Sequence, residues 1–185
     1  MALKYLHGQN IIHRDLKLDN ILLKTPEPYS KILLTDFGTA KSLPISRTYT
    51  VIGTPEYSAP EVGFRNDINY CSNENGNKGY GKPCDMWSLG IILHIMLSGI
   101  SPFYVEDGDP FKIVEASKKG KLNFHLPQWQ HINDHAKDLI SKLLSVNHYK
   151  RLTINQAFLH PWISGHAEFL SSIYQKILDN DQDSF

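Results

Sequence analysis

The sequence predicts a mainly α-helical fold with one small β-hairpin. Residues 85–97 are apolar on nearly every side of a helix, which is typical of a helix buried at the centre of a domain. Two short apolar runs, 20–23 and 31–34, are separated by prolines and polar residues, which favours a hairpin. The 185 residues, 41% of them hydrophobic, suffice for one core.

The first residues, 1–9, are predicted to be the end of a helix. Leu3, Leu6 and His7 share one face, and Gly8 supplies a stop. The two isoleucines that follow lead into a polar, charged loop.

Two later regions are predicted to be irregular. Residues 38–58 have no helical period, and residues 63–83 include an Asn/Gly-rich stretch that is expected to form an exposed insertion. The remaining helices are predicted over 110–118, over 134–144 with Asp134 as its cap, over 153–158 with Thr153 as its cap, and within 164–185, which ends in a frayed acidic tail.

Composition narrows the function classes. Lys and Arg total 19, and Asp and Glu total 19, so the zero net charge does not indicate nucleic acid or a membrane surface as a partner. Cys71 and Cys84 make neither a disulfide framework nor a zinc site and are expected to be unpaired thiols. No run approaches the roughly 20 apolar residues that span a bilayer. The protein is therefore expected to be intracellular and soluble.

Four short motifs occur in order along the chain. They are His13-Arg14-Asp15-Leu16-Lys17-Leu18-Asp19-Asn20, Asp36-Phe37-Gly38, Ala59-Pro60-Glu61 and Asp85-Met86-Trp87-Ser88-Leu89-Gly90. Taken singly, an Asp-Phe-Gly is usually a turn and a His-Arg-Asp is usually a solvated charge cluster. Taken together, the hairpin between Asp15 and Asp36 is expected to bring both carboxylates to one cleft.

These motifs resemble those of eukaryotic protein kinases. The first matches the catalytic-loop pattern H-R-D-L-x-x-x-N at every fixed position. The resemblance is to the C-terminal lobe and covers residues 1–163, which leaves 164–185 as a C-terminal tail. Lys17 and the segment 53–57 are similar to the serine/threonine branch. The resemblance implies an enzyme that uses ATP and Mg²⁺ to phosphorylate Ser/Thr hydroxyls of protein substrates.

The resemblance also implies roles for single residues. Asp15 would accept or orient the proton of the substrate hydroxyl, and Lys17 would meet the transferring phosphate. Asn20 and Asp36 would ligate magnesium, which prefers oxygen ligands. The hydroxyl of Thr54 would contact the catalytic Asp and Lys.

Further residues of the motif set would support the site. Leu22 would form the floor of the adenine pocket. Asp85 would hold the backbone of the catalytic loop. Arg151 would pair with Glu61, although an arginine in such a position is alternatively a plain surface charge.

Arg14 suggests regulation by phosphorylation. An arginine before the catalytic Asp usually pairs with a phosphate in the activation loop. Thr50 is the first candidate acceptor for an upstream activating kinase, followed by Ser46 and Thr48. The alternative is that these three are ordinary polar loop residues.

A finer resemblance is to calcium/calmodulin-type kinases, and within them to checkpoint kinases that carry forkhead-associated domains. It rests on three segments: residues 99–103, Gln128-Trp129 and residues 160–163. Gln128-Trp129 is alternatively explained by ordinary core packing. Residues 50–65 are most similar to the meiosis-specific yeast branch. Nuclear localisation is expected from this resemblance alone.

The sequence contains no glycine-rich phosphate loop, no Val-Ala-Ile-Lys strand and no partner glutamate helix. We therefore expect a fragment without the N-terminal lobe that is inactive alone. The alternative function is a non-catalytic binding module that docks a kinase or substrate through the helix near 110–118. An in-frame glycine-rich loop upstream would favour the kinase.

Overall fold

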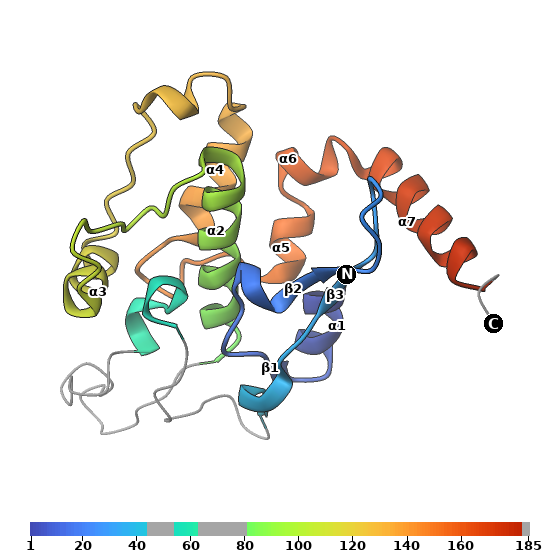
Figure 1. The fold of residues 1–185 in the computed structure, drawn as a ribbon, viewed down its shortest axis with the longest axis horizontal. Helices are drawn as coiled ribbons and strands as arrows, with labels where there is room; N and C mark the ends of the chain where they lie inside the picture. Colours follow the sequence, from blue (N-terminus) through green and yellow to red (C-terminus); the bar gives the residue numbers. More distant parts are fainter. Residues whose placement is uncertain (44–53, 63–80, 183–185) are drawn as a thin grey trace.

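The computed structural model describes residues 1–43, 54–62 and 81–182 of the chain, and Figure 1 shows their arrangement. Most of the regular structure is helical, as predicted. The helices are α1 (Ala2–Gly8), α2 (Pro83–Ser98), α3 (Pro110–Lys119), α4 (Asp134–Leu143), α5 (Ile154–Phe158), α6 (Pro161–Ser164) and α7 (Ala167–Gln182). The strands are β1 (Ile11–Ile12), β2 (Ile21–Leu23), β3 (Ile32–Leu34) and β4 (Lys41–Ser42).

Helix α2 runs through the centre of the molecule (Figure 1). Trp87 and Ile91 pack into one apolar cluster, while Met86 and Ile92 pack into a second. Gly90 lets α4 approach, since a Cβ atom there would lie 2.8 Å from the Leu144 side chain. The predicted central helix is confirmed, and it begins two residues earlier than expected because Pro83 suits a first helical turn.

The predicted hairpin is confirmed. Strands β2 and β3 pair antiparallel, with Ile21 opposite Leu34 and Leu23 opposite Ile32. A second antiparallel pair joins β1 to β4. Because each of these strands has only two residues, no alternation of side chains could reveal them from sequence, and β4 lies within the segment predicted to be a loop.

The ends of several helices differ from prediction in physical detail. Helix α4 is capped by Asn133, whose side chain accepts from the His135 N–H, so Asp134 as cap was wrong. Helix α1 ends at Gly8, but Gly8 does not have the positive φ of a left-handed glycine cap. Thr153 caps α5 through a reciprocal capping box with Gln156, as predicted.

Helix α3 occupies nearly its predicted range, and its N-terminus is capped by Asp109. Helix α6 was not predicted, because four residues give too short a period to recognise. Helix α7 lies in the predicted tail and extends away from the other helices in Figure 1. The Phe169 ring of α7 contacts Tyr29 of the hairpin edge-on, with ring centroids 6.2 Å apart.

Several predictions fall on residues outside the described ranges. Residues 44–53 of the predicted loop, residues 63–80 of the predicted insertion, Cys71 among them, and the last three residues belong there. Cys84 is described and is a buried free thiol. Within the described ranges, no helix has the length and apolar character needed to cross a bilayer.

Trp129 belongs to the core. Its side chain is fully buried, and its ring lies 4.7 Å from the ring of His94 and 4.8 Å from that of Phe124. Of the two interpretations of Gln128-Trp129, core packing is therefore sufficient to explain the tryptophan.

Candidate active site

One buried carboxylate of α2, that of Asp85, accepts hydrogen bonds from the backbone of the loop that follows β1. Asp85 accepts hydrogen bonds from the backbone N–H groups of His13 (3.0 Å) and Arg14 (2.9 Å). Its Oδ2 also lies 2.9 Å from Nε2 of His7 in α1. Arg14 has φ of 73°, a left-handed conformation that is costly for a side chain with a Cβ. Asp85 therefore fixes a strained loop at the residue directly before Asp15.

His13 ties this loop to the segment that carries Asp36. Its Nε2 lies 3.0 Å from the carbonyl oxygen of Thr35, and its own carbonyl accepts from the Thr39 hydroxyl at 2.9 Å. Its ring centroid lies 5.0 Å from that of Phe37. The predicted approach of the two motifs is therefore built from backbone and ring contacts that flank Asp36 on both sides.

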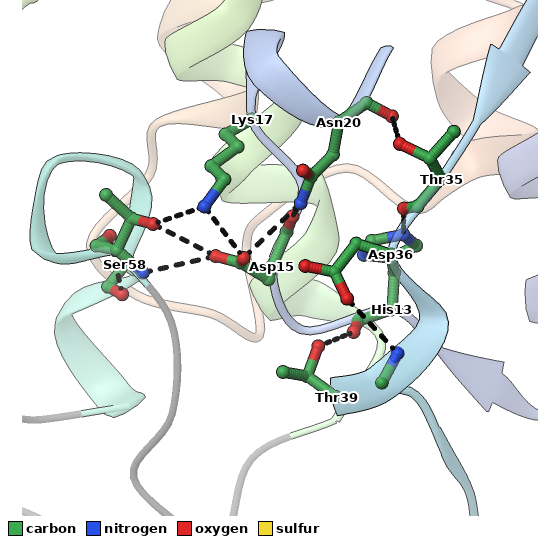
Figure 2. A network of polar contacts seen from close by, with 10 residues as sticks. His13, Asp15, Lys17, Asn20, Thr35, Asp36, Thr39 and Ser58 are labelled. Atoms are coloured by element: carbon green, nitrogen blue, oxygen red, sulfur yellow. Dashed lines mark hydrogen bonds and ion pairs between the residues drawn. The ribbon is translucent and has the colours of Figure 1, made fainter. Parts of the chain in front are cut away.

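Asp15 lies at the centre of a polar network (Figure 2). Its Oδ1 accepts from both the backbone N–H (3.2 Å) and the hydroxyl (3.1 Å) of Thr54. Its Oδ2 lies 3.0 Å from the Lys17 ammonium, which also donates to the Thr54 hydroxyl at 3.2 Å. The structure thus brings together Asp15, Lys17 and Thr54, three residues from two distant parts of the chain.

These contacts determine the protonation of Asp15. Burial acts to raise its pKa, but the hydrogen bonds from Lys17 and Thr54 outweigh burial, so the pKa of Asp15 lies below its ordinary value. The same contact with Asp15 raises the pKa of Lys17. At neutral pH the pair is therefore a carboxylate and an ammonium. A carboxylate of low pKa is a weak base, so its principal capacity is to accept a hydrogen bond and orient the donor.

Asn20 and Asp36 offer oxygen atoms suited to a magnesium ion. The Asn20 amide nitrogen donates to the backbone carbonyl of Asp15 at 2.8 Å, which leaves the amide oxygen as the outward ligand. Asp36 is exposed, and its Oδ1 accepts a long hydrogen bond of 3.3 Å from the Gly38 N–H. Magnesium is commonly bound by one or two protein oxygens together with substrate phosphates. This donor set fits that ion without a larger cluster of acidic residues.

Leu22, which is predicted to form the floor of the adenine pocket, lies in the middle of β2, and its side chain is 49% exposed. Its neighbours Leu23 and Ile32 are exposed as well. The hairpin therefore presents an apolar surface rather than burying it, which is unusual for side chains of this type.

The predicted regulatory residues divide into two groups. Ser46, Thr48 and Thr50 lie outside the described ranges. Arg14 is described: its Nε donates to the carbonyl of Thr39, and its Nη1 is buried without a hydrogen-bond partner within the described part of the chain. A buried guanidinium nitrogen without an acceptor is costly, so this position is suited to an incoming anion.

Glu61 and Arg151 form a bidentate ion pair. The Arg151 Nη1 lies 2.5 Å from one carboxylate oxygen and Nη2 lies 2.9 Å from the other. Nη1 also donates to the Pro83 carbonyl, and Nε to the Ser145 carbonyl. The Arg151 side chain is fully buried, so the alternative of a plain surface charge is wrong.

Some residues of the network were not identified from sequence. Ser58 donates to the Thr54 carbonyl at 3.0 Å, and Ser88 of α2 donates to the Tyr57 carbonyl at 2.8 Å. His7 supports Asp85, although the sequence showed only that it shares the buried face of α1. A single serine has no recognisable sequence pattern. A histidine on the apolar face of a helix, such as His7, favours a buried acidic residue as its partner.

Comparisons with known proteins identify the family of the chain. The family model of the protein kinase domain matches residues 1–163. The meiosis-specific serine/threonine-protein kinase MEK1 of Saccharomyces cerevisiae is 52% identical, with 98% of this chain and 38% of that protein covered. Its Schizosaccharomyces pombe counterpart is 42% identical, with 94% and 37% covered.

A third similar protein is the calcium/calmodulin-dependent protein kinase type 1 of Macrobrachium nipponense, which is 38% identical, with 100% of this chain and 49% of that protein covered. The chain thus spans less than half the length of these relatives. The family match over most of the chain, together with the high identity to these kinases, establishes that this chain belongs to the protein kinase domain family.

Proposed function

We propose that the protein is a serine/threonine kinase that transfers the γ-phosphate of ATP to protein hydroxyls. The observation that carries this proposal is the hydroxyl of Thr54, held 3.1 Å from Asp15 and 3.2 Å from the Lys17 ammonium. A hydroxyl can therefore be oriented at this carboxylate beside a fixed positive charge. Phosphoryl transfer requires such positioning and charge compensation rather than covalent chemistry by the protein.

The roles of the individual groups follow from their contacts. Asp15 orients the attacking hydroxyl and takes up its proton late in the step, as the new oxygen–phosphorus bond forms and the bond between the γ-phosphorus and the bridging oxygen breaks to release ADP. Lys17 offsets negative charge near the transferred group. The oxygens of Asn20 and Asp36 would hold Mg²⁺, which when bound neutralises phosphate charge. Leu22 would contact the adenine ring.

We propose further that residues 1–163 work as the C-terminal lobe and residues 164–185 as its tail. The exposed apolar side chains of the hairpin support this assignment, because they offer a surface that an N-terminal lobe would cover and that the adenine ring would contact. The 185 residues by themselves are expected to have negligible activity, because they include no phosphate-covering loop or strand lysine.

The finer assignment is to the checkpoint and meiotic group, and it rests on the identity to the MEK1 proteins. The nucleus is the compartment that this assignment implies. Arg14, whose buried Nη1 has no hydrogen-bond partner among the described residues, supports control by an activation-loop phosphate, and Thr50 remains the first candidate acceptor.

The test is a phosphotransfer assay with ATP, Mg²⁺ and a generic Ser/Thr peptide, on protein produced from its complete reading frame. Asp15→Asn is expected to lower kcat by at least a hundredfold, because an amide cannot take up the proton. Asp19→Asn, which changes an acid of the same loop, should retain at least half of the activity. Equal activity of wild type and Asp15→Asn would refute the proposal.

The alternative of a binding module predicts a different result. Such a module has no need for Asp15, Lys17 and Thr54 in mutual contact, and the network therefore favours the enzyme. Tight substrate binding without turnover by the complete product would favour the module.

A further inference from the structure

A cleft separate from the Asp15 network lies between the end of α1, the first turn of α2 and the start of α5. Its volume of about 390 Å³ lies within the range of roughly 300–1,000 Å³ that is typical of ligand sites. Apolar side chains form much of its wall, among them Pro83, Met86 and Ile154. The residues that contact Asp15, namely Lys17, Asn20 and Thr54, do not line this cleft.

The charged side chains of the cleft are all basic. Lys4 and Lys82 line it, and no aspartate or glutamate does. The Lys4 ammonium lies over the ring of Phe158, 5.2 Å from its centroid, and Lys82 donates to the side-chain oxygen of Asn10 at 2.7 Å. Neither lysine pairs with a carboxylate of the described residues. Both therefore remain available to an acidic ligand.

Two further basic residues line the cleft but are already paired on its inner side. His7 contacts Asp85, the carboxylate that holds the catalytic loop. Arg151 is paired with Glu61. A ligand in the cleft would therefore lie beside His7 and Arg151, which are already paired with Asp85 and Glu61, and its own charge would be met by Lys4 and Lys82.

We propose that this cleft binds an acidic segment of a partner protein, in which carboxylates flank an apolar side chain. The carboxylates would pair with the two lysines, and the apolar side chain would cover Met86 and Ile154. An inorganic anion would leave that apolar wall in water. Nucleic acid fits poorly, because two lysines on a protein of zero net charge cannot match a phosphate backbone.

Binding can be measured by fluorescence anisotropy with a fluorescein-labelled hexapeptide, Asp-Asp-Leu-Phe-Asp-Asp, and protein from the complete reading frame. The double variant Lys4→Glu/Lys82→Glu is expected to bind at least tenfold more weakly. The matched control Lys119→Glu/Lys121→Glu changes the same charge at the end of α3, away from α1 in Figure 1, and should bind like wild type.

A second variant tests the shape of the cleft without altering charge. A Cβ atom at Gly8 would have nothing within 4 Å, so Gly8→Leu should fold normally and fill part of the cleft. It is expected to weaken binding at least tenfold. The unfolding midpoints of all variants, measured by circular dichroism, would reveal any loss of folding.

Four outcomes would overturn the proposal: no binding of the peptide, equal binding by Lys4→Glu/Lys82→Glu, equal binding of an Asn-for-Asp peptide, or binding of sodium octanoate without the peptide. The last would assign the cleft to a small amphiphilic carboxylate. Because the readout is binding rather than phosphotransfer, the result is independent of the proposed kinase activity.

Discussion

At the scale of single residues, buried charges in this molecule are matched to specific partners. Arg151 donates to both oxygens of Glu61 and also to two backbone carbonyls. Asp85 accepts from two backbone N–H groups. Each arrangement links elements that are more than 70 residues apart, so the charges connect the motifs as well as satisfying one another.

Arg151→Met should destabilise the protein by about 3–5 kcal/mol, because Glu61 would lose its buried partner. Arg151→Lys should cost less, since charge is kept and only the bidentate geometry is lost. Urea unfolding of both variants, and of Glu61→Gln with and without Arg151→Met, measures the coupling. A loss below about 1 kcal/mol for Arg151→Met would show that the pair behaves like a surface contact.

His94 should make stability depend on pH. Burial lowers its pKa, opposed by the hydrogen bond to the Ile100 carbonyl. A histidine whose folded pKa is lowered binds fewer protons when folded than when unfolded, so its contribution is full above the unfolded value of about 6.5 and is lost as pH falls through the folded pKa.

His94→Gln is therefore expected to reduce the difference in unfolding free energy between pH 7.5 and pH 5. Urea titrations at the two pH values measure this difference. His125→Gln, at an exposed position, serves as the control. An unchanged pH dependence in His94→Gln would refute the assignment.

At the scale of elements, α2 positions both apolar clusters and the Asp85 carboxylate. Its close approach to α4 depends on Gly90, where an added Cβ would lie within 3.0 Å of Leu143 and Leu144 atoms. Elements that must approach this closely tolerate little extra volume, because protein interiors are already close-packed.

Gly90→Ala is expected to destabilise the protein by about 1–3 kcal/mol through overpacking, despite the higher helix propensity of alanine. Gly8→Ala, in a helix where the added Cβ meets nothing, is the matched control and should be neutral or slightly stabilising. Urea midpoints compare the two. Equal midpoints would mean that α2 and α4 can shift apart at little cost.

At the scale of the whole molecule, the described residues carry an apolar surface on the hairpin side of the candidate active site. Leu23 is 61% exposed and Ile32 is 57% exposed, with Phe37 close by in sequence. Such neighbouring exposed apolar side chains usually mark a surface that another part of the protein covers.

The isolated 185-residue chain is expected to bind an apolar dye such as anilinonaphthalene sulfonate. The double variant Leu23→Ser/Ile32→Ser should lower the dye fluorescence at least twofold. Met96→Ser/Leu159→Ser removes two exposed apolar side chains, one in α2 and one directly after α5, and should change it little. Equal reductions from both double variants would contradict a continuous hairpin surface.

The sequence by itself determined the elements whose evidence is local: the apolar central helix, the hairpin, and the capping box at Thr153. It also determined the order of the four motifs on which the predicted resemblance to protein kinases rests. The family comparisons confirm that family prediction.

Only the tertiary structure decided which of those residues meet. The contact of Thr54 with Asp15, the support of Asp85 by His7, and the pairing of β1 with β4 all join distant segments. The choice of Asn133 over Asp134 as a cap depended on backbone direction at the helix start. A local sequence pattern gives information about residues that are close along the chain. The contacts above join distant segments, and those segments meet because both apolar clusters pack around the buried helix α2.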